Sequence, residues 1–108
     1  MKREADGGVQ CASRGRDTLA LSGALTFATA TQAWREGRRA LAAGAQTRLD
    51  LSGLTRADSA GLACVLALAA DASRAGRRLE VVNWPDGLRT LAEVCDVAAL
   101  LGVHAKTA

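Results

Sequence analysis

The stretch LTRADSAGLACVLALAA, residues 54–70, begins with charged and hydroxyl side chains and ends as an almost unbroken apolar run. Asp58 and Ser59 stand at the junction. Before them, residues 47–53 alternate apolar and polar side chains, as a half-buried strand does. After them, apolar residues recur at helical spacing. The sequence therefore predicts a strand, a turn at Asp58 and Ser59, and a helix that runs to about Ala75.

The predicted helix is apolar beyond a single stripe. Residues at three- and four-residue spacing form its main face: Leu62, Val65, Leu66, Ala69 and Ser73. Cys64 and Leu68 lie well off that face. We therefore expect either burial of this helix on two sides or contact with a partner protein.

Strands and helices alternate on both sides of this stretch. The patterns predict strands over residues 9–13, 17–23, 47–53 and 79–83, a helix over 29–43 that ends at Gly44, and a last helix with Leu88, Leu91, Ala92 and Cys95 on its buried face. The first two strands can form a hairpin, and the later strand–helix–strand units imply parallel pairing through right-handed crossovers.

The expected fold class is therefore α/β. We expect a single domain over residues 9–102, with a mixed sheet of about four strands (an N-terminal hairpin plus parallel strands) packed with three to four helices. Residues 1–8 are expected to form a flexible N-terminus, and residues 103–108 a polar tail.

Length and composition agree with one small domain. The chain has 108 residues, of which 49% are hydrophobic, and this is enough for a core. Its formal charge of +3 does not by itself require nucleic acid or an anionic membrane as partner. The N-terminus MKREADGG lacks the apolar segment of a secretory signal, and the longest uncharged apolar run, 59–70, is too short to span a bilayer. We expect a cytoplasmic protein.

Side chains for catalysis or metal binding are scarce. The one histidine, His104, falls in the predicted tail, where no structure would hold it as a base for a nucleophile. Cys11, Cys64 and Cys95 lie far apart and show neither zinc-ligand spacing nor a disulfide framework. No glycine-rich phosphate-binding loop occurs. We therefore expect no catalytic residues, no metal and no cofactor, and interpret the chain as a binding module.

Asp58 and Ser59 admit two compatible interpretations. Both are favoured N-cap residues, and the first backbone N–H groups of the predicted helix need such an acceptor. The same helix end carries partial positive charge, so Ser59 could accept a phosphate or present a small polar group to a partner. Ala60 and Gly61 keep the neighbouring surface low, so another chain could approach closely.

The segment LDLSGLTRADSAGL, residues 49–62, resembles the signature of STAS domains, in which a strand ending in D-L-S/T leads into D-S/T-x-G-L at a helix start. The resemblance extends through DTLALSGALTFATA, residues 17–30, and GRRLEVVNWPDGLRTLAEVCDVAALL, residues 76–101. Sulfate-transporter tails and anti-sigma-factor antagonists share this family. The chain departs from the D-S-S-G-L-G pattern of the antagonists at Ala60 and Ala63, and neither change removes the serine hydroxyl.

Within the family, LSGALTFATA, residues 21–30, is most similar to the small stand-alone STAS subunit of the Mla phospholipid-transport ABC complex, which serves outer-membrane lipid asymmetry. The resemblance implies a non-catalytic cytoplasmic accessory subunit, peripheral to the inner membrane. It would bind the ABC-type ATPase subunit and, through it, a membrane permease, without direct contact with lipid or nucleic acid. The implied docking residues are Thr55, Asp58, Ser59, Ala60, Gly61 and Leu62.

Two other functions stay open at this stage. An anti-sigma-factor antagonist would carry Ser59 as its phospho-acceptor and would have an anti-sigma kinase as its partner. A small basic nucleic-acid-binding protein would need a contiguous surface of arginines. The arginines of this chain are spread over the sequence in small groups.

Overall fold

The computed structural model describes residues 8–94. Its elements, in chain order, are β1 (Val9–Arg14), β2 (Thr18–Leu25), α1 (Ala30–Ala43), β3 (Arg48–Ala57), α2 (Ser59–Arg74), β4 (Glu80–Val82) and α3 (Asp86–Val94). This order confirms the predicted α/β class and the predicted succession of strands and helices. Cys95, His104 and the predicted polar tail lie outside the described residues, as do residues 1–7 of the predicted flexible N-terminus.

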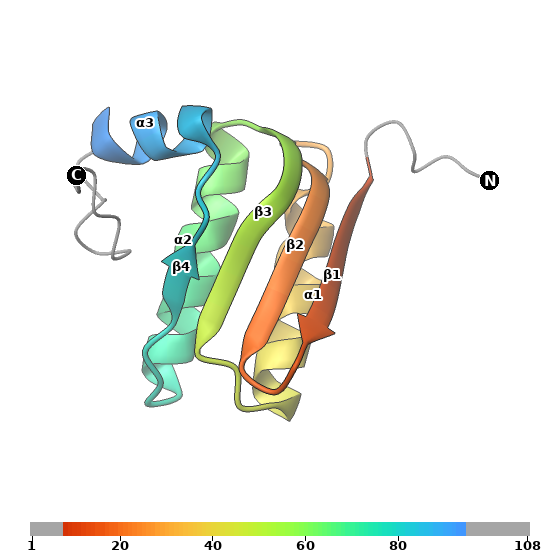
Figure 1. Ribbon diagram of the computed structural model, residues 1–108, viewed down its shortest axis with the longest axis vertical. Coiled ribbons are helices and arrows are strands. Elements are labelled where there is room, and N and C mark those ends of the chain that lie inside the picture. The colour runs from red at the N-terminus through yellow and green to blue at the C-terminus, as the bar shows by residue number, and fades with distance from the viewer. Residues whose placement is uncertain (1–7, 95–108) are drawn as a thin grey trace.

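The four strands form one mixed sheet in the order β1-β2-β3-β4. β1 pairs antiparallel with β2, whereas β2 with β3 and β3 with β4 pair parallel. Figure 1 shows α1 and α2 next to each other behind the sheet, with α3 at its upper end. Both covering helices therefore begin at the end of the sheet where β2 and β3 finish. Within residues 8–94, no helix covers the opposite face of the sheet.

Leucines of the two central strands form the centre of the core. Leu19, Leu21, Leu49 and Leu51 are 0% exposed, which confirms the alternation predicted for both strands. The helices add Ala33, Leu41, Leu62, Val65 and Leu68 to the same cluster. Full burial of one such leucine contributes about 1.5–3 kcal/mol relative to exposure. Among the described residues no helix is long and apolar enough to cross a membrane.

The helix α2 is buried on two sides, which is one of the two predicted alternatives, but its buried face differs from the predicted one. The buried residues are Gly61, Leu62, Cys64, Val65, Leu68 and Ala72, whereas Leu66 and Ala69 are half-buried and Ser73 is exposed. The second side packs against α1, where a Cβ on Gly37 would lie 2.8 Å from Leu68 Cδ2. Gly37 thus lets the two helices approach closely, and no partner protein is needed to cover this side of α2.

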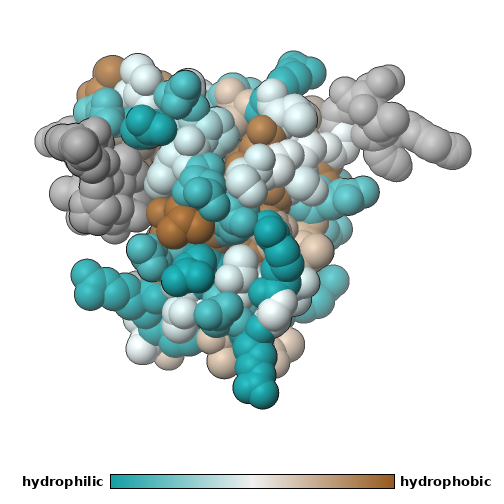
Figure 2. Space-filling model, viewed as in Figure 1, coloured by the Kyte–Doolittle hydropathy of each residue, from teal (hydrophilic) through white to brown (hydrophobic). Residues whose placement is uncertain are grey.

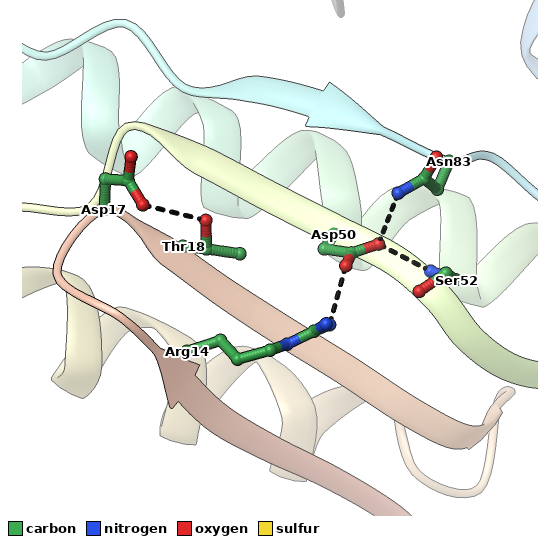
Figure 3. A network of polar contacts seen from close by, with 6 residues as sticks. All are labelled: Arg14, Asp17, Thr18, Asp50, Ser52 and Asn83. Carbon is green, nitrogen blue, oxygen red and sulfur yellow. Dashed lines mark hydrogen bonds and ion pairs between the residues drawn. The ribbon is translucent and has the colours of Figure 1, made fainter.

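The open face of the sheet carries a polar network around Asp50 (Figure 3). Arg14 extends across β2 and donates to Asp50 Oδ2 at 2.6 Å, while Asn83 Nδ2 and the Ser52 backbone N–H donate to Oδ1 at 3.0 and 2.9 Å. Asp50 lies on the polar side of its strand, as the alternation predicts, but only 7% of the residue is exposed. Figure 2 shows the rest of this face as a mixture of hydrophilic and near-neutral side chains with small hydrophobic patches.

The network keeps the carboxylate of Asp50 ionised. Burial by itself would raise the pKa of Asp50 above its ordinary value of 3.8. The hydrogen bonds from Asn83 and Ser52 and the charge of Arg14 outweigh that effect, and the pKa is lowered. The ionised form therefore stabilises the folded domain, because it bridges β1, β3 and the residue that follows β4.

Asp50→Asn is expected to lower the free energy of unfolding by about 1–3 kcal/mol at neutral pH, because Arg14 loses its counter-ion. Since the folded pKa is depressed, the contribution of the carboxylate is present above the ordinary pKa and is lost as the pH falls through the lower folded value. Urea unfolding of both chains between about pH 7 and about pH 2 measures this. The difference in stability should shrink on acidification, and a constant difference would contradict the assignment.

Candidate functional site

The turn between β3 and α2 is closed by the carboxylate of Asp58. Asp58 is the N-cap residue of α2, and its Oδ1 accepts a hydrogen bond from the Gly61 backbone N–H at 3.1 Å. Its Oδ2 accepts from the Phe27 backbone N–H at 3.1 Å. The backbone N–H of Asp58 donates to Leu25 O at 3.3 Å. One residue therefore caps α2 and fixes the β2–α1 loop against the start of that helix.

These bonds favour the ionised form of Asp58. The backbone N–H of Phe27, followed by those of Gly61 and Ala60, lowers the pKa of Asp58 below its ordinary value of 3.8. The partial positive charge at the start of α2 acts in the same direction. A negative charge therefore lies directly beside Ser59 at neutral pH.

Of the two predicted cap candidates, Asp58 is the N-cap, whereas Ser59 is the first residue of α2 and is exposed. The hypothesis that Ser59 caps the helix is therefore wrong. The physical reason is that Asp58 already satisfies the free N–H group of Gly61. The hydroxyl of Ser59 is not needed for capping, and it is accessible to a modifying enzyme or to a partner protein.

The other predicted docking residues divide into accessible and buried ones. Thr55 is exposed, and its hydroxyl donates to Gly23 O at 3.2 Å, while Ala60 is half-buried. Gly61 and Leu62 are buried, since they pack against the core below the turn. We therefore exclude Gly61 and Leu62 from the surface that a partner can contact.

An apolar hollow, which the sequence pattern does not predict, lies beside Ser59. Its volume is about 330 Å³, and its lining residues are Phe27, Ala30, Thr31, Trp34, Ala60, Ala63 and Cys64. Phe27 is 84% exposed and is the only phenylalanine of the chain. Residues from the β2–α1 loop and from the first turns of both helices meet here because α1 and α2 begin next to each other (Figure 1). The only sequence signal is an aromatic residue in a predicted loop.

Trp34 has a fixed position in the wall of this hollow. Its indole Nε1 donates to Asp71 Oδ2 at 2.9 Å, which joins α1 to α2. The Arg38 guanidinium lies 4.7 Å from the centroid of the indole ring, in a cation–π contact. Asp71 also pairs with Arg74 at 2.5 Å. These contacts fix the Trp34 wall of the hollow.

Neither a metal site nor an activated thiol is found among the described residues. Among residues 8–94, no cluster of three or more His, Cys, Asp or Glu side chains could hold a metal ion. Burial raises the pKa of Cys64 to about 11, and burial together with the charge of Glu36 raises that of Cys11 to about 11. Both thiols are therefore protonated at neutral pH and are poor nucleophiles.

A mixed four-stranded sheet, helices on one of its faces and a capped strand-to-helix turn with an exposed serine together define a STAS-type domain. The family model described as "Mlab, STAS domain" matches residues 10–102. The chain therefore belongs to this family of STAS domains, as the resemblance of its turn sequence indicates. STAS domains are generally regulatory or accessory proteins.

A solved structure with a similar fold is that of the anti-sigma factor antagonist SpoIIAA in its unphosphorylated form. The TM-score is 0.61 at 21% sequence identity, and the alignment covers 80% of this chain and 82% of that chain. At this identity the likeness shows the fold. A search of curated proteins finds no match.

Proposed function

We propose that the chain is a non-catalytic accessory subunit that binds and supports the ATPase subunit of a phospholipid-transport ABC complex. The observation that carries the proposal is the apolar hollow beside Ser59 in a domain of the Mlab STAS family. Covering an exposed phenylalanine and this hollow with a partner would remove apolar surface from water. Aromatic side chains of this kind are enriched at the centre of protein interfaces.

The revised docking surface consists of Phe27, Trp34, Ser59, Ala60 and Ala63. It keeps Ser59 and Ala60 of the predicted set and adds three residues of the hollow. The accessible side chains of Asp58 and Thr55 lie at its rim, where polar groups stay partly hydrated. Through the ATPase the chain would associate with a membrane permease at the cytoplasmic side of the inner membrane, and contact with lipid is no part of the proposal.

The tagged chain is expected to recover an ABC-type ATPase from the cytoplasm of its own source under mild salt, with identification by mass spectrometry. Phe27→Ser is the informative variant, because it removes the exposed ring without removing a core side chain. It should recover clearly less of the ATPase while the melting temperature stays near that of the parent. Recovery of an anti-sigma kinase and no ATPase would contradict this proposal.

A switch of the anti-sigma-antagonist type is the second candidate function. The observation that favours it is the exposed hydroxyl of Ser59 on the first turn of α2. A phosphate there would be stabilised by the positive helix end but opposed by the neighbouring carboxylate of Asp58. The same affinity purification separates the two functions, because a kinase partner belongs only to the second.

A further inference from the structure

Three connecting regions meet at the end of the molecule opposite the docking surface. They are the β1–β2 turn (residues 15–17), the end of α1 with the loop into β3 (38–48), and the end of α2 with the loop into β4 (71–80). Figure 1 shows all three at the lower end of the view, where both covering helices finish. We refer to this part of the structure as the arginine end.

Hydrogen bonds join these three regions. Asp17 O accepts from the backbone N–H groups of Thr47 and Arg48, both at 3.0 Å. The Arg77 guanidinium, from the region after α2, donates to the backbone oxygens of Gly44 and Gln46 at 3.2 and 3.1 Å and to that of Leu41. The regions therefore form one continuous surface, and Arg77 caps the carboxyl end of α1 through Leu41 O and the carbonyl of the C-cap residue Gly44.

The arginine end carries the excess positive charge of the described chain. Seven of the eleven arginines and three of the eight acidic residues within 8–94 belong to it: Arg16, Arg38, Arg39, Arg48, Arg74, Arg77 and Arg78, with Asp17, Asp71 and Glu80. Its net charge is +4, against −1 for the other described residues. Hydrophilic side chains project from this lower end in Figure 2.

Part of this charge is already engaged within the domain. Arg38 and Arg74 both pair with Asp71, Arg48 pairs with Glu80, and Arg77 caps α1. The other three arginines, Arg16, Arg39 and Arg78, are exposed and form no ion pair with any described residue. Each of the three connecting regions supplies one of them. The available charges are thus spread over the whole arginine end.

We propose that the arginine end binds the phosphate backbone of double-stranded nucleic acid without recognising bases. A guanidinium matches a phosphate with two parallel hydrogen bonds. The sequence pI is about 9.1, and a basic domain whose arginines gather on one surface has the electrostatic footprint of a nucleic-acid-binding protein. This is the contiguous arginine surface that the sequence by itself does not reveal.

The composition of the arginine end favours a duplex over a membrane surface or a single strand. The large hydrophobic side chains that are exposed within residues 8–94 are Phe27 and Val94, and neither belongs to this end. It therefore lacks the apolar anchors of membrane-surface binding and the aromatic platforms of single-strand binding. Because the arginine end lies opposite the docking surface, this proposal is independent of the proposed function. It departs from the expectation, implied by the family resemblance, that the chain makes no direct contact with nucleic acid.

Fluorescence anisotropy with a labelled duplex of mixed sequence tests the proposal, with the salt concentration as variable. The logarithm of the affinity falls with the logarithm of salt by about 0.9 per neutralised phosphate, so three available arginines predict a slope of about −2.7. That slope corresponds to a loss of affinity of roughly 40-fold between about 50 mM and 200 mM salt. Arg39→Gln and Arg78→Gln should each weaken binding and reduce the slope to about −1.8.

Arg56→Gln is the matched control, because Arg56 is exposed in β3 near the docking surface and forms no ion pair with a described residue. It should leave both affinity and slope unchanged. Equal weakening by Arg56→Gln would overturn the proposal, since binding would then follow net charge alone. Equal or tighter binding of labelled poly-L-glutamate, or of phosphatidylglycerol vesicles, would also overturn it and would indicate an acidic protein or a lipid surface instead.

Discussion

Gly61→Ala is expected to lower the free energy of unfolding by about 3 kcal/mol, at the upper end of what overpacking costs. A Cβ on Gly61 would lie 2.4 Å from Leu25 O, which is far inside van der Waals contact. The clashing atom belongs to the backbone of β2 and cannot rotate away, so α2 must move as a whole. The same carbonyl oxygen accepts from Asp58 N–H. The substitution therefore also disturbs Asp58, which caps α2 and holds the β2–α1 loop.

The matched control for Gly61→Ala is Gly87→Ala in α3. Gly87 is also helical and is exposed, and a Cβ there would meet no atom within 4 Å. It should be neutral or stabilise the domain by about 0.5–1 kcal/mol, because alanine is the better helix former. Chemical denaturation of the three chains measures both effects. A Gly61→Ala chain as stable as the parent would show that β2 and α2 are not as closely packed as the structure indicates.

The order of strands and helices follows from local patterns, which is why it was predictable. Leu19 and Leu21 alternate with the small or polar residues Thr18, Ala20 and Ser22 because only one face of the sheet is covered by helices. The residues at which strands and helices end depend on partners that are distant in the sequence, so local patterns predict them less well. The strand predicted over residues 17–23 runs on to Leu25, since Leu25 pairs with Ala57 of β3.

The burial of Asp50 illustrates what local pattern cannot predict. Its partners Arg14 and Asn83 are 36 and 33 residues away in the sequence and come next to it only through the strand order. A charged residue in an alternating strand is normally solvated, so periodicity places it on the open face without indicating a buried ion pair.

The candidate site was predicted in part, for a similar reason. The turn at Asp58 and Ser59 follows from residue types that favour a helix start, although sequence alone does not decide which of the two is the cap. Phe27 and Trp34 join the site because two crossovers of the same hand place the starts of α1 and α2 together. The spacing of residues within α1 or within α2 does not predict that the two helix starts lie side by side.

Ser59→Asp is expected to weaken binding of the ATPase partner by roughly 100-fold or more, because desolvating an unpaired carboxylate costs several kcal/mol. The ionised Asp58 is adjacent, so the second negative charge is also repelled by the first. In the free domain residue 59 is exposed at the positive end of α2, and the same change should alter the melting temperature little.

Ser59→Asn and Ser59→Ala separate charge from shape in this last experiment. Asparagine has nearly the size of aspartate without its charge, and alanine removes the hydroxyl while Asp58 remains as the cap. Both should keep the parent's melting temperature and most of its affinity, measured by calorimetric titration of each chain into the purified ATPase. If Ser59→Asp bound as tightly as Ser59→Asn, no desolvated contact would exist at the start of α2. The apolar hollow would then have to bind the ATPase without Ser59.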